Sequence, residues 1–536
     1  MSAFGSTGRV IRAGLGFPLP WWFFVLILSV PYVWFGSVLG ATFWIDGFNY
    51  AGLASTLGDA AAYQEFNSGY GRLALSHLQI GLPSLGWALN RLPVGWQWPI
   101  LEIFQRMISL GSLVLALGAL TVGRPRVVHL LAGSLIAWSP FLQAFHNAFM
   151  TESLSGSLLL CGFGLGVLLF RNPLSSFWLL LATAATIFLA TQFRSYYGAL
   201  IFSMAAAGLW LGRPSRKVAA SVVLAVAAIA AVLFYPACRW LATGDWFLPG
   251  VGVNRLIVAT YLNGSPGDAV RNKIETFSAA EREVLRPILT PNAPFGAENA
   301  RKLALLMLKS GMSEREVDAK LKDLGDTILT ENPEFLAKRV RHGLASSAMV
   351  DTSCVAMDGV EMFRGLSPER YHQHLGDVFR WHSWLSPEDY RASFASFFDT
   401  PRDIYPATAP GQKWMRDTEQ GYVRLPSAMA LRDPLGVGRI PPDAWAWAGL
   451  LSALVLLARR NIAGVLVLGA CLANFLVGFA VPVGNPRYAY GVFALYPLAI
   501  CALTLVCLRL PDGESLRFSF RTFFGNVLKI FHRSPA

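Results

Sequence analysis

The chain has 536 residues and a formal net charge of +12; 54% of its residues are hydrophobic and only 15% are charged. Its mean hydropathy of +0.44 is too high for a soluble protein, and its length is too great for a simple membrane anchor. No basic patch interleaved with exposed aromatic residues lies away from the apolar segments. We therefore expect membrane lipid, and no nucleic acid, as a partner.

Apolar segments of about 20 residues, the length that a helix needs to cross a bilayer, recur along the chain. We expect ten crossings, at residues 20–40, 99–122, 127–145, 153–170, 174–192, 196–212, 218–236, 443–458, 462–481 and 488–508. The predicted fold class is an all-α polytopic membrane protein. Its predicted parts are a transmembrane bundle at 1–236, an external domain at 237–442, C-terminal transmembrane helices at 443–508 and a tail at 509–536.

Positive charge sorts the loops between these segments. If Arg9 and Arg12 lie in the cytoplasm, every cytoplasmic link carries arginine or lysine, as the positive-inside rule requires. The residues concerned are Arg124, Arg126, Arg171, Arg213, Arg216, Lys217, Arg459 and Arg460. The pattern predicts a multi-pass protein of a bacterial inner membrane, with both termini cytoplasmic and the other loops facing the periplasm.

Three sections lie outside the predicted spans. Residues 41–98 form a first external loop in which tryptophans and alternating polarity predict short interfacial helices. Residues 237–442, between the seventh and eighth spans, are long enough for a mostly helical domain. Within them, Ser313 followed by Glu316 predicts a helix start with a capping box. The sequence of the tail at 509–536 predicts a basic amphipathic helix on the cytoplasmic leaflet.

Arg194 and Arg487 fall in short loops predicted to be external, where the charge rule does not place them. A guanidinium group binds phosphate through two parallel hydrogen bonds and keeps its charge when it is buried. These residues are therefore candidates for binding the phosphate of a lipid-linked substrate. The alternative is that each extends to the outer headgroups as an ordinary anchor.

Carboxylates occur at the same predicted face. Asp46 follows the first span, with Tyr50 one helical turn on, and it is the candidate general base; the alternative is a helix cap. Glu152 opens the fourth span, where it could contact an acceptor, a metal or an arginine, or favour the helix dipole. Glu102 has the same ambiguity and lies one turn before Arg106. Asp59 is a looser candidate for positioning an acceptor or metal.

The order of these elements resembles the GT-C superfamily of integral-membrane glycosyltransferases. The matching elements are Asp46 with Tyr50, Thr151 with Glu152, Arg194 with Tyr196 and Tyr197, and Arg487 with Tyr488 and Pro497. The resemblance implies a polyprenyl-phosphate sugar as donor, a glycan, lipid or protein as acceptor, and Asp46 as base. It further implies donor or sugar contacts from Tyr50, Tyr197 and Tyr488.

The sequence also departs from that family. Many relatives carry a second acidic residue directly after the aspartate, where this chain has Gly47. We therefore name no certain cofactor and leave a divalent cation, Mg²⁺ or Mn²⁺, as an open question. Two other readings remain: a transporter or flippase of a lipid-linked sugar, which predicts ionisable groups at mid-membrane and broken helices, and a non-catalytic assembly protein.

Overall fold

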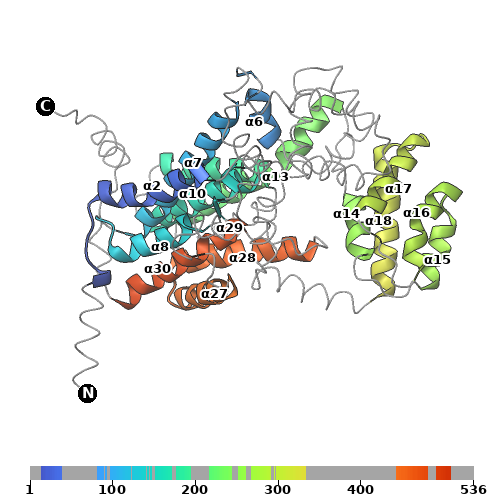
Figure 1. Ribbon diagram of the computed structural model, residues 1–536. Helices are drawn as coiled ribbons and strands as arrows, with labels where there is room; N and C mark the ends of the chain where they lie inside the picture. Colours follow the sequence, from blue (N-terminus) through green and yellow to red (C-terminus); the bar gives the residue numbers. More distant parts are fainter. Residues whose placement is uncertain are drawn as a thin grey trace, which may run out of the picture.

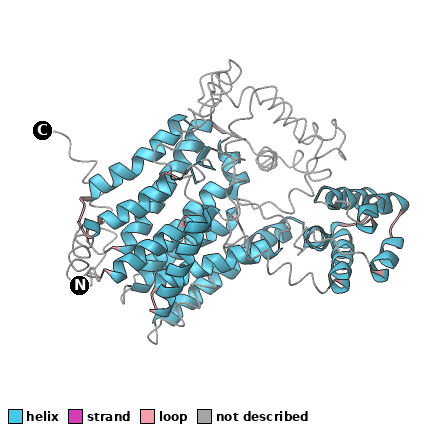
Figure 2. Ribbon diagram, turned by 60° about the horizontal axis from the view of Figure 1, so that its bottom comes forward, coloured by secondary structure: helices cyan, strands magenta, loops and turns pink. Residues whose placement is uncertain are grey.

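The computed structural model of this protein is helical throughout the part it describes (Figures 1 and 2). That part comprises residues 14–38, 81–89, 91–92, 97–121, 123–139, 142–143, 145–147, 151–171, 177–194, 216–243, 251–260, 267–290, 295, 297–332, 437, 442–480 and 490–508. No strand occurs among these residues, and a single antiparallel bridge joins Pro18 to Arg126. The predicted all-α class is confirmed for this part of the chain.

Apolar helices pack side by side as a bundle, the left-hand group in Figure 1. They are α2 (Trp21–Val38), α7 (Gln97–Leu120), α8 (Val127–Ala137), α10 (Thr151–Arg171), α11 (Phe177–Phe193), α13 (Arg216–Thr243), α27 (Pro442–Ala458), α28 (Ile462–Ala480), α29 (Tyr490–Phe493) and α30 (Leu495–Cys507). Helix α10 contacts α7, α11, α28 and α29 and is buried on nearly all sides. Gly164 lets it approach α7 closely, because a Cβ there would lie 3.0 Å from the Cα of Ala116.

The helix positions follow the predicted spans closely, but the number of crossings is not confirmed. Two helices, over Pro99–Leu120 and Thr151–Arg171, are long and apolar enough to cross a membrane. The other apolar helices within the described residues are shorter than 18 residues over their apolar part. The predicted span at 196–212 lies outside the described residues. Helix α13 continues to Thr243, beyond the predicted end at residue 236.

The predicted span at 127–145 is wrong in its extent. Helix α8 ends at Ala137, and Trp138 is its C-cap. An 11-residue helix is only about 16 Å long, roughly half the thickness of the hydrocarbon core. The reason is visible in the sequence, because Pro140 has no N–H to donate and disfavours helical geometry at Ser139.

A second group of helices lies in the section predicted as the external domain. It comprises α14 (Val251–Thr260), α15 (Asp268–Glu275), α16 (Ala279–Leu289), α17 (Ala297–Lys309) and α18 (Glu314–Glu331). The predicted capping box of Ser313 and Glu316 opens α18 as expected. Helices α14 and α18 approach closely at Gly252 and Gly325, where a Cβ would lie within about 3 Å of the opposite backbone. The short helix α6 (Gly81–Leu89), from the first predicted external loop, lies against α11.

Candidate active site

Helix α7 carries a buried ion pair close to its start. Arg106 Nε donates to Glu102 Oε1 at 3.1 Å, and both side chains are about nine-tenths buried. The pair joins residues four apart, which face each other on one side of a helix. Arg106 lies nine residues beyond Gln97, about 14 Å along the helix axis, so it is deeper than a residue at a helix end. Of the alternatives for Glu102, the structure shows the one in which it pairs with Arg106.

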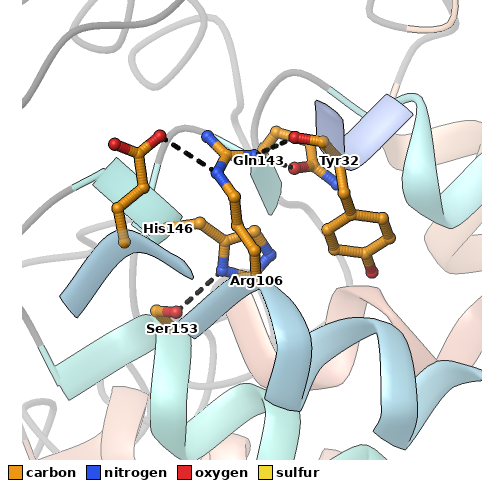
Figure 3. A network of polar contacts seen from close by, with 6 residues as sticks. Tyr32, Arg106, Gln143, His146 and Ser153 are labelled. Atoms are coloured by element: carbon orange, nitrogen blue, oxygen red, sulfur yellow. Dashed lines mark hydrogen bonds and ion pairs between the residues drawn. The ribbon is translucent and has the colours of Figure 1, made fainter. Parts of the chain in front are cut away.

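The guanidinium group of Arg106 joins α7 to two other parts of the chain (Figure 3). Its Nη1 donates to the backbone oxygen of Tyr32 on α2 at 2.8 Å, and to the side-chain Oε1 of Gln143 at 3.1 Å. Gln143 in turn donates from Nε2 to the backbone oxygen of Ala137 at the end of α8. A single buried cation therefore contacts α2, α7 and the segment that follows α8.

A histidine and a serine form a second contact beside this one. The Nδ1 atom of His146, in the 3-10 helix η1 (Phe145–Asn147), lies 2.7 Å from the hydroxyl of Ser153 on α10. Its ring stacks on Tyr32, with 5.7 Å between the ring centroids. Burial, and secondarily the charge of Arg106, lower the pKa of His146 well below its usual value.

A second buried ion pair joins α10 to the end of α11. Arg194 Nη2 contacts Glu152 Oε1, and Arg194 Nε donates to the hydroxyl of Thr151 at 3.1 Å. The Glu152 side chain is fully buried and that of Arg194 is 9% exposed. Thr151 also donates to the second carboxylate oxygen of Glu152. Residues 42 apart in sequence thus meet at one point, so Glu152 contacts an arginine.

All these groups gather at one end of the bundle, which we call the charged end: Tyr32, Glu102, Arg106, Gln143, His146, Thr151, Glu152, Ser153 and Arg194. Helices α7 and α10 begin here, and α2 and α11 finish here. The positive-inside pattern predicts that this is the external face. Three predicted site residues, Glu102, Glu152 and Arg194, therefore lie at the same end of the bundle.

The opposite end is built mainly from backbone contacts, and we call it the bridged end: residues 14–21, 118–121, 123–127 and 171. Leu19 N donates to Pro125 O at 2.7 Å, and Val127 N donates to Phe17 O at 3.1 Å. The indole of Trp21 donates to Gly123 O, and the guanidinium of Arg171 donates to Ala119 O. These bonds join the starts of α2 and α8 to the ends of α7 and α10.

The remaining predicted site residues lie outside the described residues. They are Asp46, Tyr50, Asp59, Tyr197, Arg487 and Tyr488. Their roles stay predictions. Within the described part of the chain, no three histidine, cysteine, aspartate or glutamate residues gather as metal ligands. Glu102 and Glu152 each pair with an arginine.

Five residues of the charged end were not predicted as functional: Tyr32, Arg106, Gln143, His146 and Ser153. Their polarity within an apolar stretch of sequence could have identified three of them, because Gln143, His146 and Ser153 lie close to Thr151 and Glu152. Their partners could not be predicted, because Tyr32 and Arg106 are 74 residues apart and meet only through packing.

Comparison with known proteins gives little further information. No protein-family model and no curated protein sequence matches the chain. A search of solved structures found similarity to the crystal structure of the Archaeoglobus fulgidus oligosaccharyltransferase tethered to an acceptor peptide. The identity is 11% and the TM-score 0.27; the match covers 77% of this chain and 59% of that one. A TM-score this low does not establish a common fold.

Proposed function

We propose that the chain is an integral-membrane glycosyltransferase of the GT-C type. It moves a sugar from a polyprenyl-phosphate donor to an acceptor hydroxyl on a cell-envelope glycan, lipid or protein. One observation carries the proposal: Thr151 with Glu152 and Arg194, two separate elements of the GT-C-like order, are in direct contact in a buried site. That site shares one end of the bundle with a second arginine–carboxylate pair.

The proposed reaction is a displacement at the anomeric carbon. The acceptor oxygen forms a bond to that carbon, Asp46 takes the hydroxyl proton, and the bond from carbon to phosphate oxygen breaks. The leaving polyprenyl phosphate keeps the electron pair, so negative charge develops on it. Arg194 and Arg487 stabilise that charge, because fixed cations lower the energy of a leaving phosphate as its negative charge develops.

The contacts of Arg194 define its part in this site. Thr151 and Glu152 bind its Nε and Nη2 atoms, and these contacts fix the orientation of the planar guanidinium group. Glu152 is thus a positioning residue for Arg194.

The bridged end favours a transferase over a transporter or flippase. A transporter must open to each side of the membrane in turn. Backbone hydrogen bonds at Leu19 and Val127 and the Trp21 contact hold the starts of α2 and α8 together. Opening that end would break several of these bonds at once. A site reached from the charged end alone fits group transfer at a single membrane face.

The test uses the purified full chain in lipid nanodiscs with a panel of polyprenyl-phosphate pentoses and hexoses, each labelled in the sugar. Envelope extract serves as the acceptor pool, with and without EDTA. Transfer releases free polyprenyl phosphate and moves the label to the acceptor, and Asp46→Asn is the matched inactive control. Intact donor that changes leaflet in proteoliposomes would support the flippase instead. The lipid-phosphate sugar that accumulates in deletion cells identifies the donor.

A further inference from the structure

Arg106 is a buried charged residue at the charged end of the bundle. Only 8% of its surface is exposed, and it lies beyond the first two turns of α7. Burial of a cation is unfavourable unless hydrogen bonds and an opposite charge compensate it. Its charge is compensated by Glu102, and further contacts come from Tyr32 and Gln143.

The geometry of these contacts requires arginine. Nε donates to Glu102 on one side, while Nη1 donates to both the Tyr32 carbonyl and Gln143 on another. Figure 3 shows the guanidinium beside Tyr32 and Gln143. A lysine has one nitrogen on a flexible stem and cannot hold the same three groups in the same plane.

Helix α2 is adapted to receive this guanidinium. Gly36 lies one turn beyond Tyr32, and a Cβ there would come within 3.2 Å of Arg106 Nε and 3.4 Å of Glu102 Oε1. The Tyr32 hydroxyl lies 3.0 Å from that of Ser109 on α7, and its ring stacks on His146. Near its C-terminal end, α2 is thus joined to α7 and η1 by polar contacts. Nearer its start, Phe24 and Leu28 pack in the apolar core.

Helix α2 ends at Val38, eight residues before Asp46. The position of its last turn therefore sets where the first predicted external loop begins. We propose that Arg106 is a positioning residue that fixes the end of α2 against α7 and the segment after α8, and so holds the start of the loop that carries the base. This inference rests on the proposed function for its catalytic part. It assigns Glu102 to holding Arg106 rather than to binding an acceptor.

The first test is Arg106→Lys, which keeps the positive charge and removes the planar guanidinium group with its several donors. We expect the turnover number to fall at least tenfold while the KM for the donor changes less than threefold. Gly36→Ala displaces the guanidinium without removing any polar group, and we expect a smaller fall in the same direction. The matched control is Arg171→Lys, which makes the same exchange at the bridged end and should leave turnover unchanged.

A second set of variants separates positioning from stability. Replacement of both members of a buried ion pair by uncharged residues often leaves a protein as stable as before. Glu102→Gln with Arg106→Met should therefore keep the thermal midpoint near that of the parent protein and still lose turnover. If Glu102 acts only through Arg106, then Glu102→Gln should have no further effect once Arg106→Met is present.

A third measurement does not depend on transferase activity. Hydrogen–deuterium exchange of the 32–38 segment in nanodiscs should be at least several-fold faster in Arg106→Lys than in the parent protein or in Arg171→Lys. Absence of transfer by the parent protein would reject the proposed function but would leave this measurement intact. Unchanged exchange in Arg106→Lys, or parental turnover in the stable double variant, would overturn the positioning role.

Discussion

The two ends of the helix bundle are held together by different kinds of contact. At the bridged end, main-chain hydrogen bonds such as Leu19 to Pro125 join the helices, with Trp21 and Arg171 donating to carbonyl groups. At the charged end, buried side chains make the contacts, above all the pairs Glu102–Arg106 and Glu152–Arg194. Main-chain bonds tolerate most side chains, whereas buried ion pairs require particular ones. This difference is what we expect if the first end maintains the fold and the second carries the proposed chemistry.

The largest expected difference between the ends is in their accessibility. Single cysteines at Ser68 and Ser313, in a cysteine-free background, should react with a membrane-impermeant thiol reagent from the periplasmic side. A cysteine at Arg124, in the bridged end, should react only after the membrane is opened. Labelling of Ser68→Cys and Ser313→Cys from opposite sides would contradict the topology and, with it, the location of the active site.

The next largest effect is expected at the base. Asp46→Asn keeps the size of the side chain and removes the proton acceptor, so turnover should fall roughly a hundredfold or more. Affinity for the polyprenyl-phosphate donor should remain close to that of the parent protein. Near-normal transfer by this variant would give the role of base to another carboxylate, with Asp59 the first to examine.

The arginines separate phosphate binding from anchoring. Arg194→Lys and Arg487→Lys keep a cation for topology and remove the planar donor, so donor affinity should weaken by about 1.5 to 3 kcal/mol. We expect the larger loss for Arg487, because Gly484, Asn485 and Pro486 predict a tight turn that fixes its starting point. Isothermal titration of donor into nanodiscs gives the comparison; parental affinity and turnover in both variants would make them anchors.

A smaller effect is expected at Glu152. Glu152→Gln keeps the size of the side chain and removes the charge that holds the guanidinium of Arg194, so donor affinity should weaken by less than in Arg194→Lys. The thermal midpoint should fall at the same time, because the buried ion pair between Glu152 and Arg194 is lost. Donor binding and turnover equal to those of the parent protein would show that Glu152 does not position Arg194.

The smallest effect is expected at the bridged end. Trp21→Phe removes the indole N–H that donates to Gly123 O at 3.1 Å and keeps most of the ring. Loss of one such bond should lower the free energy of unfolding by about 1 kcal/mol and leave turnover unchanged. A fall in turnover without a fall in stability would show that this end takes part in the reaction after all.

Helix positions were predictable because long apolar runs leave few alternatives. The helix expected at 153–170 is found over 151–171, and that expected at 20–40 over 21–38. The exception, at 127–145, arose because apolar content was given more weight than the helix-ending effect of Pro140. Hydropathy measures burial in lipid or protein alike, so it could not show which helices cross a membrane.

The candidate site was predictable only as a set of unusual residues. Arg194 stood out by its charge and Glu152 by its place at a helix start, yet nothing local indicated that they touch. Pairing of residues 42 apart depends on how α10 and α11 pack. Glu102 and Arg106 could be paired from sequence, because their spacing brings them together in any helix, but the contact with Tyr32 could not.

The two ion pairs also differ in when they can form during biosynthesis. Glu102 and Arg106 belong to one helix, so α7 can enter a bilayer with its charges already neutralised. Glu152 lies in the first turn of α10 and Arg194 directly follows α11, so their contact forms only after α10 and α11 have met. Since contact between opposite charges lowers the cost of placing them in lipid, insertion of these two helices as a hairpin is favoured over insertion one at a time. The residues that mark the site thereby impose an order on its assembly.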